Sequence, residues 1–382
     1  MSRPLSIVAD QQISFATEAF SRFGDVTLVD GRSIDWQRIK KADVLLVRSI
    51  TRVDETLLKD TPVRFVGSAT SGIDHIDLNY LESAGIRFIH APGSNARSVA
   101  EYVLSSLFVL AEQQVFSLSD KTMGIIGCGQ VGSRVKRFMD ALGVRCLLND
   151  PPLAQQSDNQ AWSNLEQTLS ADIISLHVPL VVDGDFPTAN LVNKNFLSRL
   201  KSDVIFINTS RGEVVNEMDL MEFKRSHPDS KLILDVWQNE PEIDLELLQQ
   251  ASISTPHIAG YSFDGKLKAT RMLSDALCDF TNTEKQSLDI QFPDQENGII
   301  DLVANDDMVQ LAVLQSYDVR SDAIALRDML NLTEDKRIGY FDNLRKNYPV
   351  RREFKNWTIQ SKNISGHTRQ QLQQLGFNLE VA

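Results

Sequence analysis

Residues Thr122–Asp150 read T-M-G-I-I-G-C-G-Q-V-G-S-R-V-K-R-F-M-D-A-L-G-V-R-C-L-L-N-D. This order predicts an apolar strand over Met123–Ile126, a G-x-G-x-x-G turn over residues 127–132, an amphipathic helix, and a second strand that ends at the acidic Asp150. Glycines at this spacing also occur by chance in ordinary turns, so the spacing alone is a weak signal. Here a strand precedes the turn, a helix follows it and an acid lies about 20 residues further on, which favours a dinucleotide-binding turn.

The three glycines have separate physical roles in such a turn. Gly127 permits the tight turn, Gly129 lets backbone amides approach a pyrophosphate, and Gly132 lets helix and strand pack closely. The N-terminus of the following helix offers unpaired N–H groups and the positive end of a dipole to the phosphates. Asp150 would accept hydrogen bonds from the ribose hydroxyls and repel a 2′-phosphate. The stretch therefore predicts NAD, rather than NADP, as the cofactor.

The composition is that of an ordinary globular protein, and 382 residues are enough for two or three domains. The net charge of −12 argues against a nucleic-acid surface, which is normally basic, so an anionic substrate should bind where basic residues gather locally. No apolar run is long enough to span a membrane, and the N-terminus lacks a signal-peptide pattern. Cys128, Cys146 and Cys278 are scattered, so we expect neither disulfides nor a metal site, and a cytoplasmic location.

Short apolar runs alternate with helix-like segments along the first 280 residues. This alternation predicts parallel sheets that are covered by helices on both faces. The expected helices are Ile13–Phe23, Asp35–Lys41, Leu78–Ala84, Ser98–Glu112 and Asp264–Phe280. The helix Ser98–Glu112 is so apolar that we expect it to be buried at a domain boundary.

The composition turns polar from about Thr281, with a linker around Gln291–Gly298. The remaining residues are typical of a separate α+β unit. Its expected helices are Asp306–Ser316, Ala323–Met329, Tyr340–Lys346 and Thr368–Leu375, and its expected strands are N-W-T-I-Q and F-N-L-E-V.

Three residues near the predicted strand ends form a set suited to hydride transfer from an alcohol. Arg211 offers a planar fork that matches a carboxylate. The imidazole of His257 can act as a base, and Glu240 would orient its ring. Each residue alone has an ordinary explanation, as a surface ion-pair partner, a helix-start acid or a loop residue. Together, at the carboxyl ends of successive strands that follow a nucleotide motif, they predict a catalytic site.

These motifs resemble the D-isomer-specific 2-hydroxyacid dehydrogenases, and the resemblance covers essentially the whole chain. The stretches that support it are V-R-S-I-T, S-A-T-S-G-I-D-H-I-D, A-P-G-S-N-A, L-N-D-P-P, H-I-A-G-Y-S-F-D-G-K, Y-D-V-R-S-D and F-D-N-L-R-K-N-Y-P-V-R-R-E-F. Two positions depart from the family pattern: Val178 replaces a frequent Thr, so any contact there must use its backbone, and Ser94 replaces a Cys.

The resemblance implies an α/β fold with a flavodoxin-like substrate domain, an inserted Rossmann NAD domain and a C-terminal α+β dimerisation domain. The implied boundaries are 1–96 with 259–283 for the substrate domain, 97–258 for the NAD domain and 284–382 for the dimerisation domain. It implies Arg211, Glu240 and His257 as catalytic residues and Ser49, Thr70 and Tyr261 as substrate contacts. The residues expected at the cofactor are Gly127, Gly129, Gln130, Val131, Gly132, Asp150, Val178, Thr209, Ser210, Asp235 and Gly260.

The activity implied by the resemblance is the NAD-dependent oxidation of a small phosphorylated 2-hydroxy acid to its 2-oxo acid by a homodimer. Two alternatives stay open: phosphoglycerate or another short hydroxy acid as substrate, and a non-enzymatic, NAD-sensing corepressor on the same scaffold. The substrate phosphate could be held by Arg48 and Ser49. It could also be held by a basic cluster, for which a solvated surface is an equally good interpretation. The members of that cluster are Arg345, Lys346, Arg351, Arg352 and Lys355.

Overall fold

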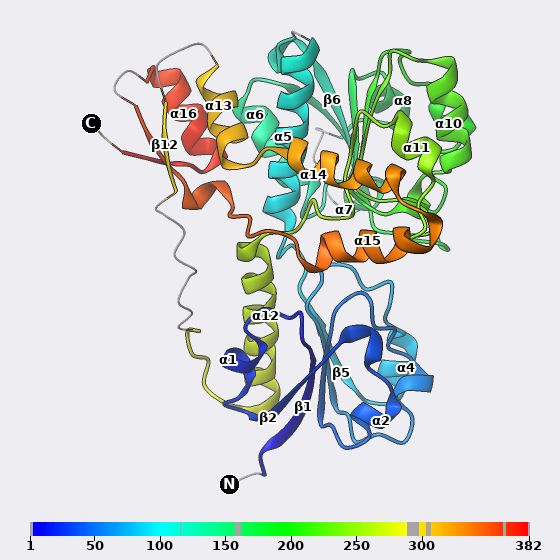
Figure 1. Cartoon of the computed structure of the whole chain (residues 1–382), viewed down its shortest axis with the longest axis vertical. Coiled ribbons are helices and arrows are strands. Elements are labelled where there is room, and N and C mark those ends of the chain that lie inside the picture. Colours follow the sequence, from blue (N-terminus) through cyan, green and yellow to red (C-terminus); the bar gives the residue numbers. More distant parts are fainter. Residues whose placement is uncertain are drawn as a thin grey trace. The chain divides into compact units, whose positions relative to one another are not determined.

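The computed structural model describes residues 3–114, 116–156, 162–288, 298–302, 307–361 and 364–380. The chain divides into two compact units (Figure 1). The first unit combines Met1–Asn95 with Ser262–Gln295, and the second combines Ala96–Tyr261 with Glu296–Ala382. Most of the expected linker at 291–298 lies outside the described residues.

The first unit is built on a five-stranded parallel sheet in the order β2-β1-β3-β4-β5. Its strands are β1 (Leu5–Asp10), β2 (Gly24–Val29), β3 (Val44–Val47), β4 (Phe65–Ser68) and β5 (Arg87–His90). This is the flavodoxin-like order, in which ligands bind outside the carboxyl ends of the strands.

Helices cover both faces of this sheet. Because alternate residues of a strand face opposite sides, Val44 and Leu46 pack on one face and Leu45 and Val47 on the other. The first face is covered by α1 (Ala16–Phe20) and α12 (Phe263–Thr281), and the second by α2 (Trp36–Ile39), α3 (Glu55–Leu58) and α4 (Leu78–Ser83).

The second unit contains a six-stranded parallel sheet in the order β11-β10-β9-β8-β6-β7. Its strands are β6 (Thr122–Ile126), β7 (Arg145–Asn149), β8 (Ile173–Leu176), β9 (Ile205–Asn208), β10 (Lys231–Leu234) and β11 (Ile253–Ser254). The strand order reverses between β6 and β8, which is where a Rossmann sheet opens a ligand crevice. The predicted α/β fold with a Rossmann-type sheet is confirmed.

One face of this sheet packs on α5 (Ala96–Gln114) and α6 (Gly132–Ala141). The other face packs on α8 (Leu165–Leu169), α9 (Lys194–Leu197), α10 (Glu217–Ser226) and α11 (Leu245–Gln250), while α7 (Pro151–Gln156) follows β7. Fifteen of the 19 residues of α5 are buried, in agreement with its apolar sequence.

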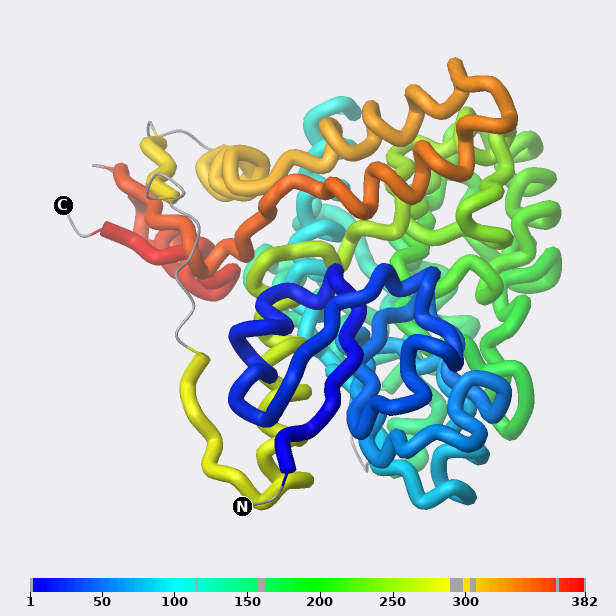
Figure 2. Tube along the Cα trace, turned by 60° about the horizontal axis from the view of Figure 1, so that its bottom comes forward, coloured from blue at the N-terminus to red at the C-terminus, as the bar shows by residue number. Residues whose placement is uncertain are grey.

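The C-terminal residues form α13 (Met308–Ser316), α14 (Val319–Arg327), α15 (Glu334–Lys346) and α16 (Gly366–Leu375), with the small parallel sheet β12 (Ile299–Asp301), β13 (Thr358–Gln360) and β14 (Asn378–Leu379). They belong to the second compact unit, in which Leu326 and Phe341 share one core with Leu247 of α11. In Figure 2 the orange helices α14 and α15 accordingly lie beside the green part of the chain. Their role in dimerisation stays a prediction.

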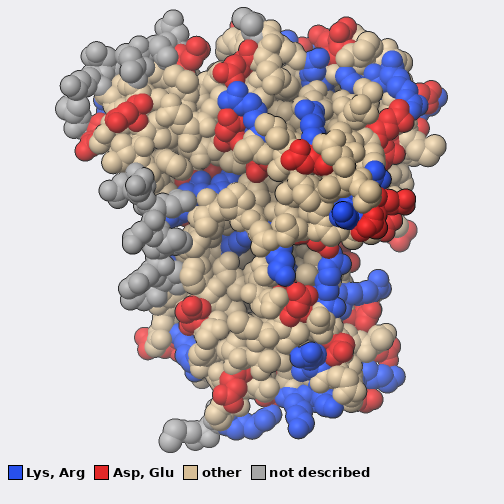
Figure 3. Space-filling model, in the orientation of Figure 1, with Lys and Arg blue, Asp and Glu red and all other residues tan. Residues whose placement is uncertain are grey.

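No helix among the described residues is both long and apolar enough to cross a bilayer. On the face that Figure 3 shows, basic and acidic side chains are interspersed rather than gathered in blocks of one sign. This mixture agrees with a net charge of −12 that is spread along the chain rather than concentrated in one block.

Candidate active site

The glycine-rich turn has the close contacts that the sequence predicts. Gly127 has φ +87°, and a Cβ at this position would lie 2.6 Å from the carbonyl oxygen of His177. A Cβ on Gly132 would lie 2.0 Å from the carbonyl oxygen of Gly127, so helix α6 can approach β6 only without a side chain there. A Cβ on Gly129, in contrast, would meet no described atom within 4 Å, which leaves open space above the turn.

The start of α6 is suited to bind phosphate groups. Val131 precedes the helix, and its apolar side chain makes no capping hydrogen bond to the first N–H groups of α6. Asp150 lies at the end of β7, where its Oδ2 accepts a 2.7 Å hydrogen bond from the Cys128 N–H. Because a carboxylate has about four acceptor sites, it keeps capacity for ribose hydroxyls. The turn, the helix end and the acid therefore fit NAD.

Other predicted cofactor residues follow successive strands at the same edge of the sheet. Val178 comes after β8 and lies against the glycine-rich turn, since a Cβ on Gly127 would be only 2.9 Å from Val178 Cγ1. Thr209 follows β9, with its hydroxyl 3.3 Å from His177 Nδ1. Ser210 is buried, and its hydroxyl donates to Asn208 Oδ1 at 2.7 Å.

Asp235, after β10, is almost completely buried, and its carboxylate holds the loop that carries His257. Oδ1 accepts from the Thr255 hydroxyl at 2.6 Å and the Ile258 N–H at 2.8 Å, and Oδ2 accepts from the Ala259 N–H at 3.0 Å. Burial raises the pKa of Asp235, although these donors and His257 oppose the shift. The sequence identified the residue but not this supporting role.

His257 and Glu240 form a hydrogen-bonded pair in the second unit. His257 Nδ1 lies 2.8 Å from Glu240 Oε2, and Glu240 Oε1 accepts from the Trp237 N–H at 2.9 Å. The imidazole keeps 33% of its surface exposed, against 18% for the carboxylate. Burial opposes ionisation of Glu240, yet His257 and Arg345 hold the pKa of Glu240 below its ordinary value. Because Nδ1 faces Glu240, Nε2 is the ring nitrogen that this contact leaves for a substrate.

The backbone of His257 has the left-handed φ of +57°. Such strain in a non-glycine residue persists where the surroundings fix the chain. Here the His257 N–H donates to the Asp235 carbonyl at 2.7 Å, and the next two N–H groups bind the Asp235 carboxylate. The position of the imidazole is thus held by its backbone as well as by Glu240.

Arg211 follows β9 and begins the short 3₁₀ helix Gly212–Val214. Its Nη1 donates to the Ser210 carbonyl at 2.8 Å, and its own carbonyl accepts from Asn208 Nδ2 at 2.9 Å. A Cβ on Gly212 would lie 2.0 Å from the Trp237 carbonyl group, so this glycine lets the Arg211 loop pack directly on the loop of Glu240. Sequence reasoning missed both this contact and Glu217, whose Oε1 accepts from the Gln238 N–H at 2.8 Å.

The predicted substrate contacts Ser49 and Thr70 lie in the first unit, after β3 and β4. Ser49 is exposed, and the Thr70 hydroxyl donates to the Gly72 carbonyl at 2.9 Å. Arg48 Nε binds the buried Asp10 carboxylate at 3.0 Å, which fixes a guanidinium at the carboxyl end of the sheet.

Comparison with known proteins identifies the family of the chain. Residues 97–259 match the family model "D-isomer specific 2-hydroxyacid dehydrogenase, NAD binding domain". Over 383 residues, 99% of this chain and 97% of the relative, the sequence is 42% identical to an erythronate-4-phosphate dehydrogenase of Psychromonas ingrahamii. The chain belongs to the D-isomer-specific 2-hydroxyacid dehydrogenase family. It is an NAD-dependent oxidoreductase, as the sequence predicts.

One further relative and two solved structures extend the comparison. An erythronate-4-phosphate dehydrogenase of Klebsiella pneumoniae is 41% identical over 98% of both chains. A D-lactate dehydrogenase of Aquifex aeolicus, solved with NAD and lactic acid, has a TM-score of 0.61 and 25% identity, and the match covers 72% of this chain and 96% of that one. The fold is shared by an NAD⁺-bound 3-phosphoglycerate dehydrogenase of Entamoeba histolytica, with a TM-score of 0.63 and 24% identity. That match covers 73% of this chain and 96% of the other. Residues 295–376 match a domain of unknown function.

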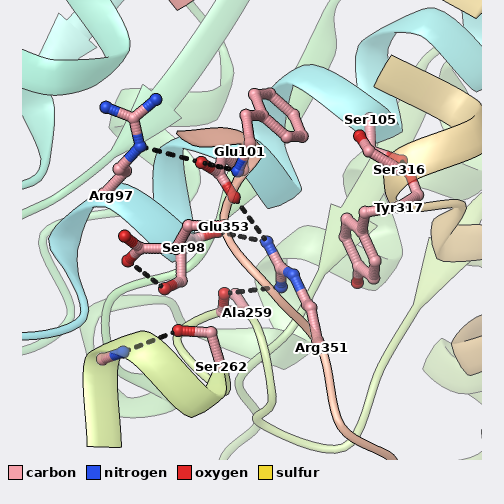
Figure 4. Close-up of polar contacts among 12 residues, drawn as sticks. Arg97, Ser98, Glu101, Ser105, Ala259, Ser262, Ser316, Tyr317, Arg351 and Glu353 are labelled. Atoms are coloured by element: carbon pink, nitrogen blue, oxygen red, sulfur yellow. Dashed lines mark hydrogen bonds and ion pairs between the residues drawn. The ribbon is translucent and has the colours of Figure 1, made fainter. Parts of the chain in front are cut away.

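The basic C-terminal cluster of this dehydrogenase is not a solvated face throughout. Arg351 is 6% exposed, so that interpretation is wrong for it. Its Nη2 donates to the Ser98 carbonyl at 2.6 Å and lies 4.0 Å from Glu101 Oε2 (Figure 4). Burial raises the pKa of Glu101 to about 8, with Glu353 adding to the rise. Lys346 and Lys355 are exposed.

Proposed function

We propose that the protein oxidises 4-phospho-D-erythronate to 3-hydroxy-2-oxo-4-phosphooxybutanoate in pyridoxal 5′-phosphate (vitamin B6) synthesis. The hydrogen bond between His257 Nδ1 and Glu240 Oε2, beside the loop of Arg211, is the observation that carries the proposal. The names of the relatives, at 41–42% identity over nearly the whole chain, support the choice of substrate.

The catalytic roles follow from the chemistry of the three side chains. Arg211 binds the C1 carboxylate through its planar fork. His257 accepts the proton of the C2 hydroxyl at Nε2, because its Nδ1–H is directed to Glu240. Glu240 fixes this tautomer and stabilises the imidazolium that forms. Bound NAD⁺ supplies the acceptor for the hydride that leaves C2.

The remaining predicted site residues contact either the substrate or the cofactor. Ser49, Thr70 and Tyr261 bind substrate, and Arg48 beside Ser49 is the proposed donor to the phosphate. The turn at 127–132 and Asp150 hold the NAD pyrophosphate and ribose. Val178, Thr209, Ser210, Asp235 and Gly260 line the rest of the cofactor site. We assign 1–96 with 259–283 to the substrate domain, 97–258 to the NAD domain and 284–382 to the dimerisation domain.

The test measures NADH absorbance with 4-phosphoerythronate, 3-phosphoglycerate, glycerate and D-lactate. We expect the highest kcat/KM with 4-phosphoerythronate. A higher value with phosphoglycerate would assign the alternative substrate, and no NADH formation with any acid would contradict the proposal.

Variants at two histidines test the assignment of the base. His257→Ala should lower kcat by roughly 10²–10⁴-fold and leave the NADH dissociation constant, measured by fluorescence, unchanged. His367→Ala, at an exposed position of α16, is the matched control and should behave like the wild type. Equal turnover in both variants would refute the role of His257.

We also propose a cytoplasmic homodimer that is formed through the C-terminal domain. Ile324 of α14, Ile338 of α15 and Val350, which are 63%, 41% and 50% exposed, give the C-terminal segment three apolar side chains that a partner subunit could cover. Ile324→Glu with Ile338→Glu should give a monomer in light scattering, whereas Met218→Glu, at an 84% exposed site on α10, should not. A dimer that survives the double change would place the interface elsewhere.

A further inference from the structure

The loop of His257 lies next to the point where the chain leaves the second unit. Strand β11, before the loop, is two residues long, and the chain passes out of the unit after Tyr261. A loop between so short a strand and the end of a compact unit has few neighbours in the sequence that could fix it. Its position therefore depends on contacts from other parts of the chain.

Asp235 holds one side of this loop. Its carboxylate accepts from the Ile258 N–H at 2.8 Å and from the Ala259 N–H at 3.0 Å. Its carbonyl accepts from the His257 N–H at 2.7 Å. All three contacts bind N–H groups of the loop and come from a single residue after β10, so they leave the Ala259 carbonyl to another partner.

Arg351 is that partner, and it belongs to the C-terminal segment that begins at α13. Its Nη1 donates to the Ala259 carbonyl at 3.1 Å, across 92 positions of the sequence (Figure 4). Because Asp235 binds the N–H of Ala259 and Arg351 binds its carbonyl, Ala259 is held on both sides by buried side chains. His257 lies two residues before this doubly held position.

The guanidinium of Arg351 is itself fixed. Its Nη2 donates to the Ser98 carbonyl of α5 at 2.6 Å, and its Cζ lies 3.6 Å from the centroid of the Tyr317 ring (Figure 4). The Ser98 hydroxyl in turn donates to Glu353 Oε1 at 3.0 Å, so the backbone near Arg351 is attached to the same turn of α5. The contact with Ala259 extends this attachment to the loop.

A charged side chain is costly to bury, and Arg351 is almost completely buried. Its planar fork offers what a smaller or apolar side chain lacks, namely two Nη groups that donate in different directions at the same time. Here the two groups join a carbonyl of α5 to a carbonyl of the His257 loop. The geometry of the fork therefore explains why an arginine occupies this position.

On the basis of the proposed function, we propose that Arg351 is a positioning residue, which fixes the loop of His257 to α5 so that the imidazole stays within reach of the substrate hydroxyl. The region that matches a domain of unknown function, residues 295–376, thereby supports the reaction itself. Arg351 acts through the Ala259 backbone and does not touch the reacting atoms. A base that is displaced by about 1 Å loses about 100-fold in rate, so loss of this anchor lowers kcat.

A direct contact between Arg351 and the substrate phosphate is the competing explanation. Both Nη atoms are engaged with backbone carbonyls, and the side chain is buried, which favours the positioning role. The two explanations differ in the kinetic constant they affect. Loss of a phosphate contact would raise the KM for 4-phosphoerythronate at constant kcat, whereas loss of positioning lowers kcat.

The experiment compares Arg351→Gln with the matched control Arg327→Gln. Arg327 of α14 also donates to two backbone carbonyls, those of Ala251 and Ser252, but these lie before β11 and outside the loop of His257. Both variants therefore lose the same kind of contact between the C-terminal segment and the second unit. Arg351→Gln should lower kcat by roughly 10–100-fold, up to the loss for a shift of about 1 Å, and Arg327→Gln should keep the wild-type kcat.

Two further comparisons sharpen this test. The NADH dissociation constant of Arg351→Gln should change by a smaller factor than kcat, because only Gly260 of the proposed cofactor residues lies in this loop. Arg351→Lys, with Arg327→Lys as its control, makes the same comparison if Arg351→Gln does not fold. A lysine lacks the fork and cannot join both carbonyls as arginine does, so kcat should fall in the first variant and not in the second.

Hydrogen exchange of the full chain, followed by mass spectrometry, gives a readout that does not depend on turnover. The amides of Ile258 and Ala259 should exchange roughly 2–10-fold faster in Arg351→Gln, the factor that one buried hydrogen bond contributes to a local opening equilibrium. They should exchange at the wild-type rate in Arg327→Gln. The amides of β10 are the reference that separates opening of the loop from unfolding of the whole unit.

A folded Arg351→Gln protein with wild-type kcat and exchange would overturn the positioning role. Equal losses of kcat in Arg351→Gln and Arg327→Gln, or a change confined to the KM for 4-phosphoerythronate, would also overturn it. Any of these results would leave the proposed function standing if the wild type oxidises 4-phosphoerythronate and His257→Ala does not.

Discussion

Gly212→Ala tests the direct packing of the Arg211 loop on the Glu240 loop. The added Cβ would lie 2.0 Å from the carbonyl carbon and oxygen of Trp237, whereas real Cβ contacts stay above 3.0 Å. The two loops must therefore separate by at least about 1 Å, since neither neighbouring atom belongs to a flexible side chain. A displacement of this size at a reacting group lowers the rate by about 100-fold. The strain should also lower the free energy of unfolding by about 1–3 kcal/mol.

The assay is kcat/KM from NADH absorbance, together with the NADH dissociation constant and Tm. We expect the rate to fall by a larger factor than NADH binding, because the pyrophosphate-binding turn follows β6, whereas only Thr209 and Ser210 of the proposed cofactor site share the loop of Gly212. The control is Gly339→Ala within α15, where a Cβ would meet no described atom within 4 Å. That change should stabilise the helix by roughly 0.5–1 kcal/mol and leave the rate unaltered. A folded Gly212→Ala protein with wild-type kcat/KM would refute the argument.

Three further changes test other parts of the second unit. Burial lowers the pKa of His177 from 6.5 to about 3, so its neutral form stabilises the fold above pH 6.5 and this stability is lost as the pH falls towards 3. Between pH 7 and pH 5 the free energy of unfolding, measured with urea, should fall by about 2 kcal/mol more in the wild type than in His177→Gln. An equal fall in the two proteins would contradict this. Arg351→Gln leaves the buried Ser98 and Ala259 carbonyls without their guanidinium donor and should lower the free energy of unfolding by about 1–3 kcal/mol, whereas an unchanged stability would mean that these two hydrogen bonds contribute nothing. Asp150→Asn removes the charge that repels a 2′-phosphate and should lower the KM for NADP relative to NAD; an unchanged ratio would exclude Asp150 from the ribose site.

Local sequence patterns predicted the fold well because a helix, a strand or a turn depends mainly on residues that are close together in the sequence. The strand, turn and helix around Gly127 and the long apolar helix α5 can be recognised from the order of their residues alone. The expected helix over 323–329 instead begins at Val319 and ends at Arg327, followed by a 3₁₀ turn. Strand β12 was missed because its three residues adjoin a polar stretch and pair with β13, about 60 residues later.

The supporting contacts of the site could not be predicted, because they join distant parts of the sequence. In the sequence, Arg351 is one charge in a basic run, but the carbonyl to which it donates belongs to Ser98, 253 positions away. The use of both Asp235 oxygens for the loop of His257 likewise requires the sheet to be formed first. The sequence identifies residue types at strand ends, and only the packed structure tells which of them support the others.

The burial of α5 has a consequence for how the chain is made. One side of this helix packs on the Rossmann sheet, while Phe354 and Leu372 belong to the same core from the far end of the sequence. During synthesis the sheet and α5 leave the ribosome well before those two residues do. An unfinished chain therefore exposes part of the apolar surface of α5 until Phe354 and Leu372 have been made. Release from the ribosome before those residues are added should yield a product that chaperones retain or proteases remove.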